Sequence, residues 1–146
     1  GDARVPRHAC RSGKMSEPVW LDSRDVIDIH AEQLAMFGGP EGVRDHGLLE
    51  SAILRPVNQW HYGQSDLAVL AAAYAFGLAR NHPFIDGNKR MAFQAMMVFL
   101  RINDVPFAPK PADATAIILA LAAGEVSEES LARWIRDNWP RTDASS

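Results

Sequence analysis

Residues 82–90, with the sequence HPFIDGNKR, carry the side chains that transfer of a phosphoryl or nucleotidyl group requires. His82 is of the side-chain type whose charge changes near neutral pH, so it is a candidate to take a proton from an attacking hydroxyl. Asp86 is a candidate ligand for a Mg²⁺ ion that bridges phosphate oxygens. Lys89 and Arg90 add the positive charge that a transferring phosphate needs.

The same stretch is expected to break one helix and start another. Pro83 disfavours helical geometry at His82, while Gly87 and Asn88 are residue types that tolerate a positive φ. A strongly apolar segment, residues 89–102, follows at once and is predicted to be a helix. Unpaired N–H groups at its start would form an anion site suited to phosphate.

Each of these residues also has a structural interpretation. A histidine before proline is commonly a loop or capping residue, Asp-Gly-Asn is an ordinary turn, and two adjacent cations commonly lie on the surface. The functional interpretation rests on the coincidence of all of them in one turn-rich loop that leads into an apolar helix, because such loops on a rigid scaffold tend to carry function.

The rest of the chain predicts an all-α domain that positions this loop. The helix capped by Ser23 is expected to stop at Gly38-Gly39-Pro40. A second helix over 48–54 is expected to end before Pro56, and residues 57–63 are expected to form a loop or small hairpin, the one short flap of the fold.

Four further helices complete the expected architecture. The first is capped by Ser65 and runs to about residue 81. The second, residues 89–102, is apolar nearly all round and is predicted to be the central buried helix. The last two cover 112–123 and a segment capped by Ser127.

Composition bounds the class of protein. The 146 residues, 47% hydrophobic and 23% charged, fit one ordinary globular domain. A net charge of −3 argues against binding nucleic acid through bulk charge, and no apolar run approaches the roughly 20 residues that span a bilayer. The single cysteine, Cys10, favours a reducing, cytoplasmic setting.

The sequence also predicts the bounds of the domain. Residues 1–18, in which Met15 is a candidate natural start, are predicted to be a disordered tail. The domain is predicted to cover residues 19–139, and residues 140–146 are predicted to be a disordered end.

Residues 82–90 resemble the Fic/Doc family signature, His-Pro-Phe-x-(Asp/Glu)-Gly-Asn-Gly-Arg, with lysine in place of the last glycine. That lysine is typical of the Doc branch, the death-on-curing toxins of toxin–antitoxin modules. Residues 42–52 resemble the upstream family segment Gly-x-Arg-Asp-x-Gly-Leu-Leu-Glu-Ser-Ala. The resemblance extends over about residues 19–139 and implies the compact helical bundle of the family.

The resemblance implies roles for individual residues. His82 matches the catalytic histidine that deprotonates a target hydroxyl, and Asp86 matches the acidic residue that binds Mg²⁺ together with ATP phosphates. Gly87 and Asn88 match the anion-binding turn, and Arg90 matches the phosphate-binding arginine.

Lys89 and Phe93 are departures from the Fic pattern that bear on the reaction. Lys89 would occupy room that a phosphate uses in the adenylylating orientation, and it would stabilise a transferring phosphoryl group. Phe93 stands where many Fic enzymes carry a second arginine, and Gln94 is the polar residue expected to face the site.

The resemblance therefore implies a protein kinase toxin that moves the γ-phosphate of ATP to a hydroxyl, with a threonine of elongation factor Tu as the expected target. An adenylyltransferase, or a catalytically silent partner-binding protein of the same fold, is the alternative.

The chain lacks the family's self-inhibiting pattern Ser/Thr-x-x-x-Glu-Gly/Asn, so restraint is expected from a separate antitoxin, with no direct role for nucleic acid or membrane. Trp60, His61 and Tyr62 lie where relatives carry a target-positioning flap, although packing on the core explains them equally well. A zinc hydrolase is less credible, because His82 and Asp86 have no third ligand at suitable spacing and the other histidines are scattered.

Overall fold

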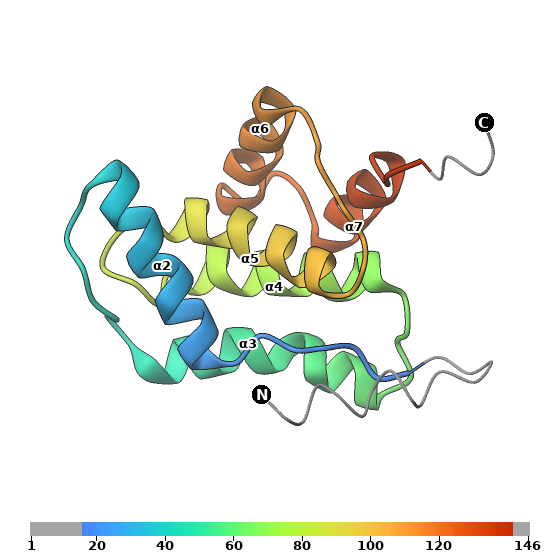
Figure 1. Cartoon of the computed structure of the whole chain (residues 1–146), viewed down its shortest axis with the longest axis horizontal. Helices are drawn as coiled ribbons and strands as arrows, with labels where there is room; N and C mark the ends of the chain where they lie inside the picture. Colours follow the sequence, from blue (N-terminus) through green and yellow to red (C-terminus); the bar gives the residue numbers. More distant parts are fainter. Residues whose placement is uncertain (1–15, 142–146) are drawn as a thin grey trace.

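The computed structural model describes residues 16–141, and these form six helices and no strand. The helices are α2 (Ser23–Phe37), α3 (His46–His61), α4 (Leu67–Asn81), α5 (Asn88–Ile102), α6 (Pro111–Ala122) and α7 (Glu128–Asp137) (Figure 1). The predicted all-α class is confirmed. Most of the predicted N-terminal tail and of the predicted C-terminal end lies outside the described residues. None of the helices between residues 16 and 141 has both the length and the apolar character to cross a bilayer.

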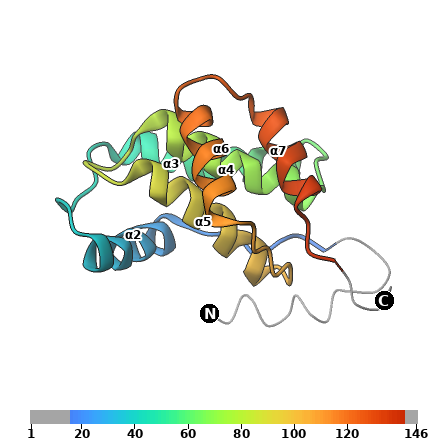
Figure 2. The ribbon, with the colours of Figure 1, turned by 90° about the horizontal axis from the view of Figure 1, so that it is seen from above.

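A central buried helix is present, but it is α4 rather than the predicted segment 89–102. The α4 helix packs against α3, α5, α6 and α7 (Figure 1). It is rich in alanine, and most of its side chains are buried. Small side chains let neighbouring helices approach from several directions, which explains the central position. The α5 helix instead lies between α4, α2 and α6, and in the view from above α2 lies apart from α6 and α7 (Figure 2).

The α3 helix corrects the prediction for the second helix and the flap. It is continuous through Pro56 to His61, so the expected end before Pro56 and the expected loop or hairpin over 57–63 are both wrong. Pro56 is buried, and packing of this face against α4 offsets the hydrogen bond that proline cannot make. The contact is close at Gly77, where an added Cβ would lie 3.0 Å from the Cβ of Ala52.

Two helix starts differ from the prediction by one residue. Asp22, rather than Ser23, caps α2: its side chain accepts from the N–H of Asp25, and the Asp25 side chain accepts from the N–H of Asp22. Asp66, rather than Ser65, caps α4. In both cases a carboxylate satisfies an N–H group that a helix start leaves unpaired.

The segment that precedes α2 is held on the core by Tyr74 of α4. The Tyr74 hydroxyl accepts from the N–H of Leu21 at 2.9 Å and donates to the Leu21 carbonyl at 3.3 Å. Burial raises the pKa of the Tyr74 phenol well above its usual value. Trp20 stacks on Phe99 of α5, with ring centroids 5.8 Å apart. These contacts fix the start of α2, and the glycine turn after its far end lies against Asp86 in the loop between α4 and α5.

Candidate active site

The loop between α4 and α5 is bounded by two left-handed residues. The α4 helix ends at Asn81, and His82 follows it with φ 51° and ψ 56°. Gly87 has φ 78° and ψ 19° and is the N-cap of α5. The predicted break at 82–88 is therefore confirmed. A non-glycine residue rarely adopts this conformation, so neighbouring groups must hold His82 in place.

Arg44, from the link between α2 and α3, supplies these contacts. Its guanidinium donates from Nε to the His82 carbonyl at 2.8 Å and from Nη2 to the Asn81 carbonyl at 3.0 Å. The backbone N–H groups of Arg44 and Asp45 both donate to the Pro83 carbonyl, at 2.7 and 3.1 Å. A cation at the carbonyl end of a helix is also electrostatically favourable. Arg44 thus closes α4 and fixes the backbone from which the His82 side chain projects.

The Asn88 side chain closes the loop from the other end. Its Oδ1 accepts from the N–H of Phe84 and its Nδ2 donates to the Phe84 carbonyl, both at 2.9 Å. The Phe84 ring is buried in the core. The Asn88 amide is therefore held in place, and its second side-chain N–H and its backbone N–H remain for contact with a phosphate.

Asp86 is positioned by His30 and by Gly39. The buried His30 ring stacks on Phe84 at 3.8 Å between centroids, and its Nε2 lies 2.8 Å from the Asp86 carbonyl, to which it donates. The Asp86 carboxylate lies against the glycine turn after α2, where a Cβ on Gly39 would be 2.9 Å from Oδ2. Glycine at this position therefore makes room for the carboxylate.

A cavity of about 550 Å³ lies at this loop. Its lining includes six of the seven predicted site residues, together with Ile85 and the end of α2: Phe37, Gly38, Gly39, His82, Ile85, Asp86, Gly87, Asn88, Lys89 and Arg90. Gln94 does not line it; this side chain is half-buried one helical turn further along α5. The Arg90 guanidinium lies 4.3 Å from the centroid of the Phe37 ring, an arrangement that favours the cation.

The start of α5 makes the cavity electropositive. Within residues 16–141 no side chain caps this end, and the hydrogen-bond ladder begins with the Met91 N–H donating to the Gly87 carbonyl at 2.9 Å. The N–H groups of the first turn are thus open, and the exposed side chains of Lys89 and Arg90 stand beside them. Open N–H groups, the helix dipole and two cations together favour a polyanionic ligand such as a phosphate chain.

The family model described as the Fic/DOC family matches residues 20–100, which include the loop and the Arg44 segment. The chain belongs to the Fic/Doc family. It is 46% identical over 92 residues, 61% of this chain and 68% of the relative, to the Toxin Doc of Mycolicibacterium smegmatis (strain ATCC 700084 / mc(2)155). It is 34% identical over 119 residues, 80% of this chain and 92% of the relative, to the Protein kinase doc of Escherichia phage P1.

The cavity of this Fic/Doc protein fits a metal ion that is shared with a phosphate. The Asp86 carboxylate is exposed and faces the cavity. Among the described residues, no group of three or more His, Cys, Asp or Glu side chains is placed so that it could hold a metal ion. Mg²⁺ is commonly held by one or two carboxylates while substrate phosphates and water complete its shell. A single carboxylate beside an anion site therefore suits Mg²⁺ bound together with a nucleotide, and it does not suit zinc held by protein ligands alone.

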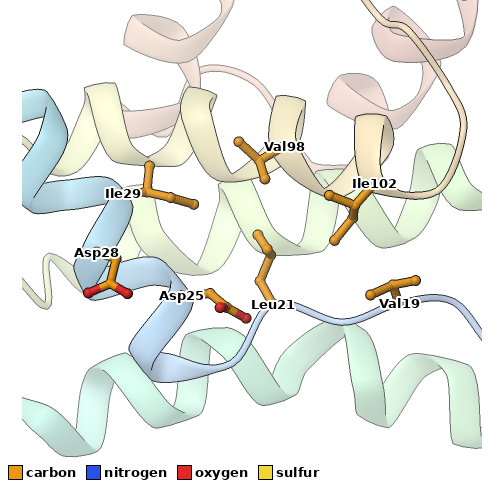
Figure 3. Close-up of a pocket in the computed structure, with 7 residues that line it drawn as sticks. All are labelled: Val19, Leu21, Asp25, Asp28, Ile29, Val98 and Ile102. Carbon is orange, nitrogen blue, oxygen red and sulfur yellow. The ribbon is translucent and has the colours of Figure 1, made fainter. Parts of the chain in front are cut away.

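A second cavity, of about 330 Å³, lies between the segment before α2, α2 itself and α5 (Figure 3). Its apolar walls are formed by Val19, Leu21, Ile29, Val98 and Ile102. Two carboxylates of α2 stand at one side, and no cation or histidine lines it. It shares no residue with the loop cavity, and its carboxylates have no cation beside them to attract a phosphate, so it is not the candidate site for phosphate chemistry.

Four residues that position the site escaped the sequence analysis. They are His30 and Phe37 of α2, Gly39, which the sequence predicts only as part of a helix stop, and Arg44, which enters only through the segment that resembles the family. Two consecutive glycines after an amphipathic helix are a weak signal that Gly39 lies in a tight turn. His30, Phe37 and Arg44 each contact a residue far away in the sequence, so no local pattern identifies these contacts.

Proposed function

We propose that this protein is a toxin that acts as a protein kinase, moving the γ-phosphate of ATP to a hydroxyl of a translation protein, a threonine of elongation factor Tu. The observation that carries the proposal is one cavity that contains a histidine, a carboxylate and two cations at an open helix start. The printed names of two relatives, Toxin Doc and Protein kinase doc, support the toxin and kinase classes.

In the proposed reaction His82 is the base. Its imidazole takes the proton of the target hydroxyl as the oxygen attacks the γ-phosphorus of ATP. A new oxygen–phosphorus bond forms, and the bond between the γ-phosphorus and the β,γ-bridging oxygen breaks. ADP leaves with that electron pair. The αL backbone of His82, held by Arg44, keeps the imidazole in the cavity.

The α5 start and its cations balance the charge of the phosphates. The N–H groups of Gly87 and Asn88, with the side chains of Lys89 and Arg90, would contact phosphate oxygens. Asp86 would hold Mg²⁺, which when bound neutralises charge on those oxygens. Lys89 lies closest in sequence to the Asn88 turn, and its ammonium would stabilise the phosphoryl group as it moves.

An unrestrained toxin of this kind would stop the translation of its own host. We therefore infer that a separate antitoxin protein restrains it, and that it acts in the cytoplasm, where elongation factor Tu is found. Neither nucleic acid nor membrane is needed by this mechanism.

The test is the arrest of a bacterial translation extract by the purified protein with ATP and Mg²⁺. His82→Ala should abolish arrest, and it should abolish the appearance of phosphothreonine on elongation factor Tu. His46→Ala is the matched control, because His46 is exposed and lies outside the cavity; it should behave as the wild type. Full activity of His82→Ala would overturn the assignment of the base.

A further inference from the structure

A cavity of about 740 Å³, called here the α3–α7 cavity, lies where α3 ends and where α4 and α7 begin. Its lining includes side chains from the end of α3, from α4 and from the first turns of α7: Gln59, Tyr62, Val69, Glu128, Glu129 and Ala132. None of these six residues lines the loop cavity. Val69 lies near the start of α4, whereas the loop follows the far end of that helix (Figure 1), about 18 Å along its axis. The α3–α7 cavity is therefore distinct from the site of phosphate chemistry.

The α3–α7 cavity is negatively charged, in contrast to the loop cavity. Two carboxylates line it, and none of the described residues in its lining is a lysine, arginine or histidine. The Glu128 carboxylate already pairs with the guanidinium of Arg55, outside the lining. The Glu129 side chain is exposed, and no cation within residues 16–141 forms an ion pair with it. Glu129 can thus accept a cation that a ligand supplies.

The amide of Gln59 adds a second acceptor to the lining. Its Nε2 donates to the Glu128 carboxylate at 3.0 Å, and this orientation is fixed because a carboxylate can only accept. The Gln59 Oε1 is therefore directed elsewhere, and it is buried without a hydrogen-bond partner in the described part of the chain. A buried acceptor without a partner costs free energy, so the lining favours a ligand that brings hydrogen-bond donors.

Tyr62 is the most exposed of the large hydrophobic side chains that the structure describes, at 92%. Its ring takes part in none of the ring–ring or cation–ring contacts within residues 16–141. The aliphatic side chains of Val69 and Ala132 lie in the same lining. The cavity thus combines an aromatic ring and apolar surface with carboxylate and amide acceptors.

We propose that the α3–α7 cavity binds an arginine-bearing segment of a partner protein, with the guanidinium between Tyr62 and Glu129. A guanidinium is planar and cationic, so it stacks on an aromatic ring and pairs with a carboxylate through two hydrogen bonds. The aliphatic stem of arginine packs on apolar surface, which Val69 and Ala132 provide. The cavity has the volume of pockets that bind ligands larger than one side chain, so residues beside the arginine enter with it.

A lysine meets fewer of these requirements. Its ammonium is compact and strongly hydrated, and it cannot form the planar, two-bond pair with a carboxylate. The proposal does not depend on the proposed function, because the α3–α7 cavity shares none of its residues with the loop cavity. A partner that docks there leaves the loop of His82 open.

Nuclear magnetic resonance of the isotope-labelled protein tests the proposal with a defined probe, the peptide acetyl-Ala-Arg-Ala-Arg-Ala-amide. Its addition should shift the amide signals of residues that line the α3–α7 cavity and leave those of residues 82–90 in place. The same peptide with citrulline in place of arginine keeps the shape and loses the charge, so it should bind about tenfold more weakly. The lysine peptide should bind with an intermediate affinity.

Variants of the lining locate the contacts. Glu129→Gln should weaken binding of the arginine peptide about three- to fivefold, the effect expected of an exposed ion pair. Tyr62→Leu keeps apolar bulk but removes the ring face, and it should weaken binding about two- to fivefold. Glu125→Gln is the matched control, because Glu125 is an exposed glutamate before α7 that does not line the cavity; it should leave the affinity unchanged.

Three results would overturn the proposal. The first is the absence of saturable binding by the arginine peptide, and the second is a set of shifted signals that lies away from the α3–α7 cavity. The third is an equal loss of affinity in Glu125→Gln and Glu129→Gln, which would show attraction by overall charge alone. Affinity that falls in Glu129→Gln and Tyr62→Leu but not in Glu125→Gln would support it.

Discussion

Replacing Asn88 with alanine should loosen the loop that carries His82. The amide makes two hydrogen bonds to the backbone of Phe84, both at 2.9 Å. The backbone bonds that flank Phe84 join Ile85 to Gly42 and Arg44 to Pro83, so they cannot replace the lost pair. The variant therefore leaves one N–H and one carbonyl of Phe84 without these partners beside a buried ring.

The expected loss follows from those two groups. Each buried polar group left unpaired costs about 1–3 kcal/mol. Since Asn88 is only half-buried, water can partly replace the amide, and we expect a total of about 2–4 kcal/mol. For a domain of this size that loss lowers Tm by roughly 5–15 °C.

Guanidinium unfolding measures the loss as a lower midpoint at an unchanged m-value. Asn58→Ala is the matched control, because Asn58 is exposed on α3; it should change stability by no more than about 0.5 kcal/mol. Asn88→Asp keeps an acceptor for the Phe84 N–H, so it should recover part of the stability while its negative charge weakens nucleotide binding. An Asn88→Ala variant as stable as Asn58→Ala would refute the reasoning.

Three further changes have defined outcomes. Gly39→Ala should raise the Mg²⁺ concentration needed for half-maximal activity by about tenfold, because its Cβ would displace the Asp86 carboxylate. Gly38→Ala is the control: Gly38 has φ +81° and nothing within 4 Å of an added Cβ, so this variant shares the backbone strain without the collision. An equal effect of the two variants would contradict the prediction. Burial raises the pKa of Tyr74, whereas the phenol of an unfolded chain ionises near pH 10; the stability from this group is thus complete below about pH 10 and falls above it, by up to about 1.4 kcal/mol per pH unit. Tyr74→Phe should remove this alkaline dependence from unfolding curves, and an unchanged pH profile would be the contrary result. Lys89→Gly should lower γ-phosphate transfer by about 10²-fold and allow transfer of AMP, measured with labelled ATP; undiminished γ-phosphate transfer would show that Lys89 has no part in selecting the reaction.

Local chemistry explains why the loop could be predicted from the sequence. Pro83 and Gly87 restrict or permit backbone angles by themselves, so the break and the start of α5 follow from residue type. The same kind of argument was wrong at Pro56, because the packing of α3 on α4 outweighs the local cost of a proline inside a helix. The contacts between α3 and α4 thus determine where α3 ends, and a local sequence pattern contains no information about them.

The positioning contacts of the site could not be predicted for a similar reason. His30 is 56 residues from Asp86, and Arg44 is 38 residues from His82. Gln94 shows the limit of helical periodicity: it lies four residues after Arg90, about 6 Å further along the axis, and it does not line the cavity. Residue types thus predicted the candidate reacting groups, and the packing of α2 against the loop determines how they are held.

Paired labelling of the acceptor distinguishes transfer of the γ-phosphate from transfer of AMP. Elongation factor Tu is incubated with the protein, Mg²⁺ and ATP that carries label on either the α- or the γ-phosphate. A kinase should give labelled elongation factor Tu from γ-labelled ATP only, with the signal lost in His82→Ala. Label transferred from the α-phosphate would show an adenylyltransferase and would contradict the kinase assignment.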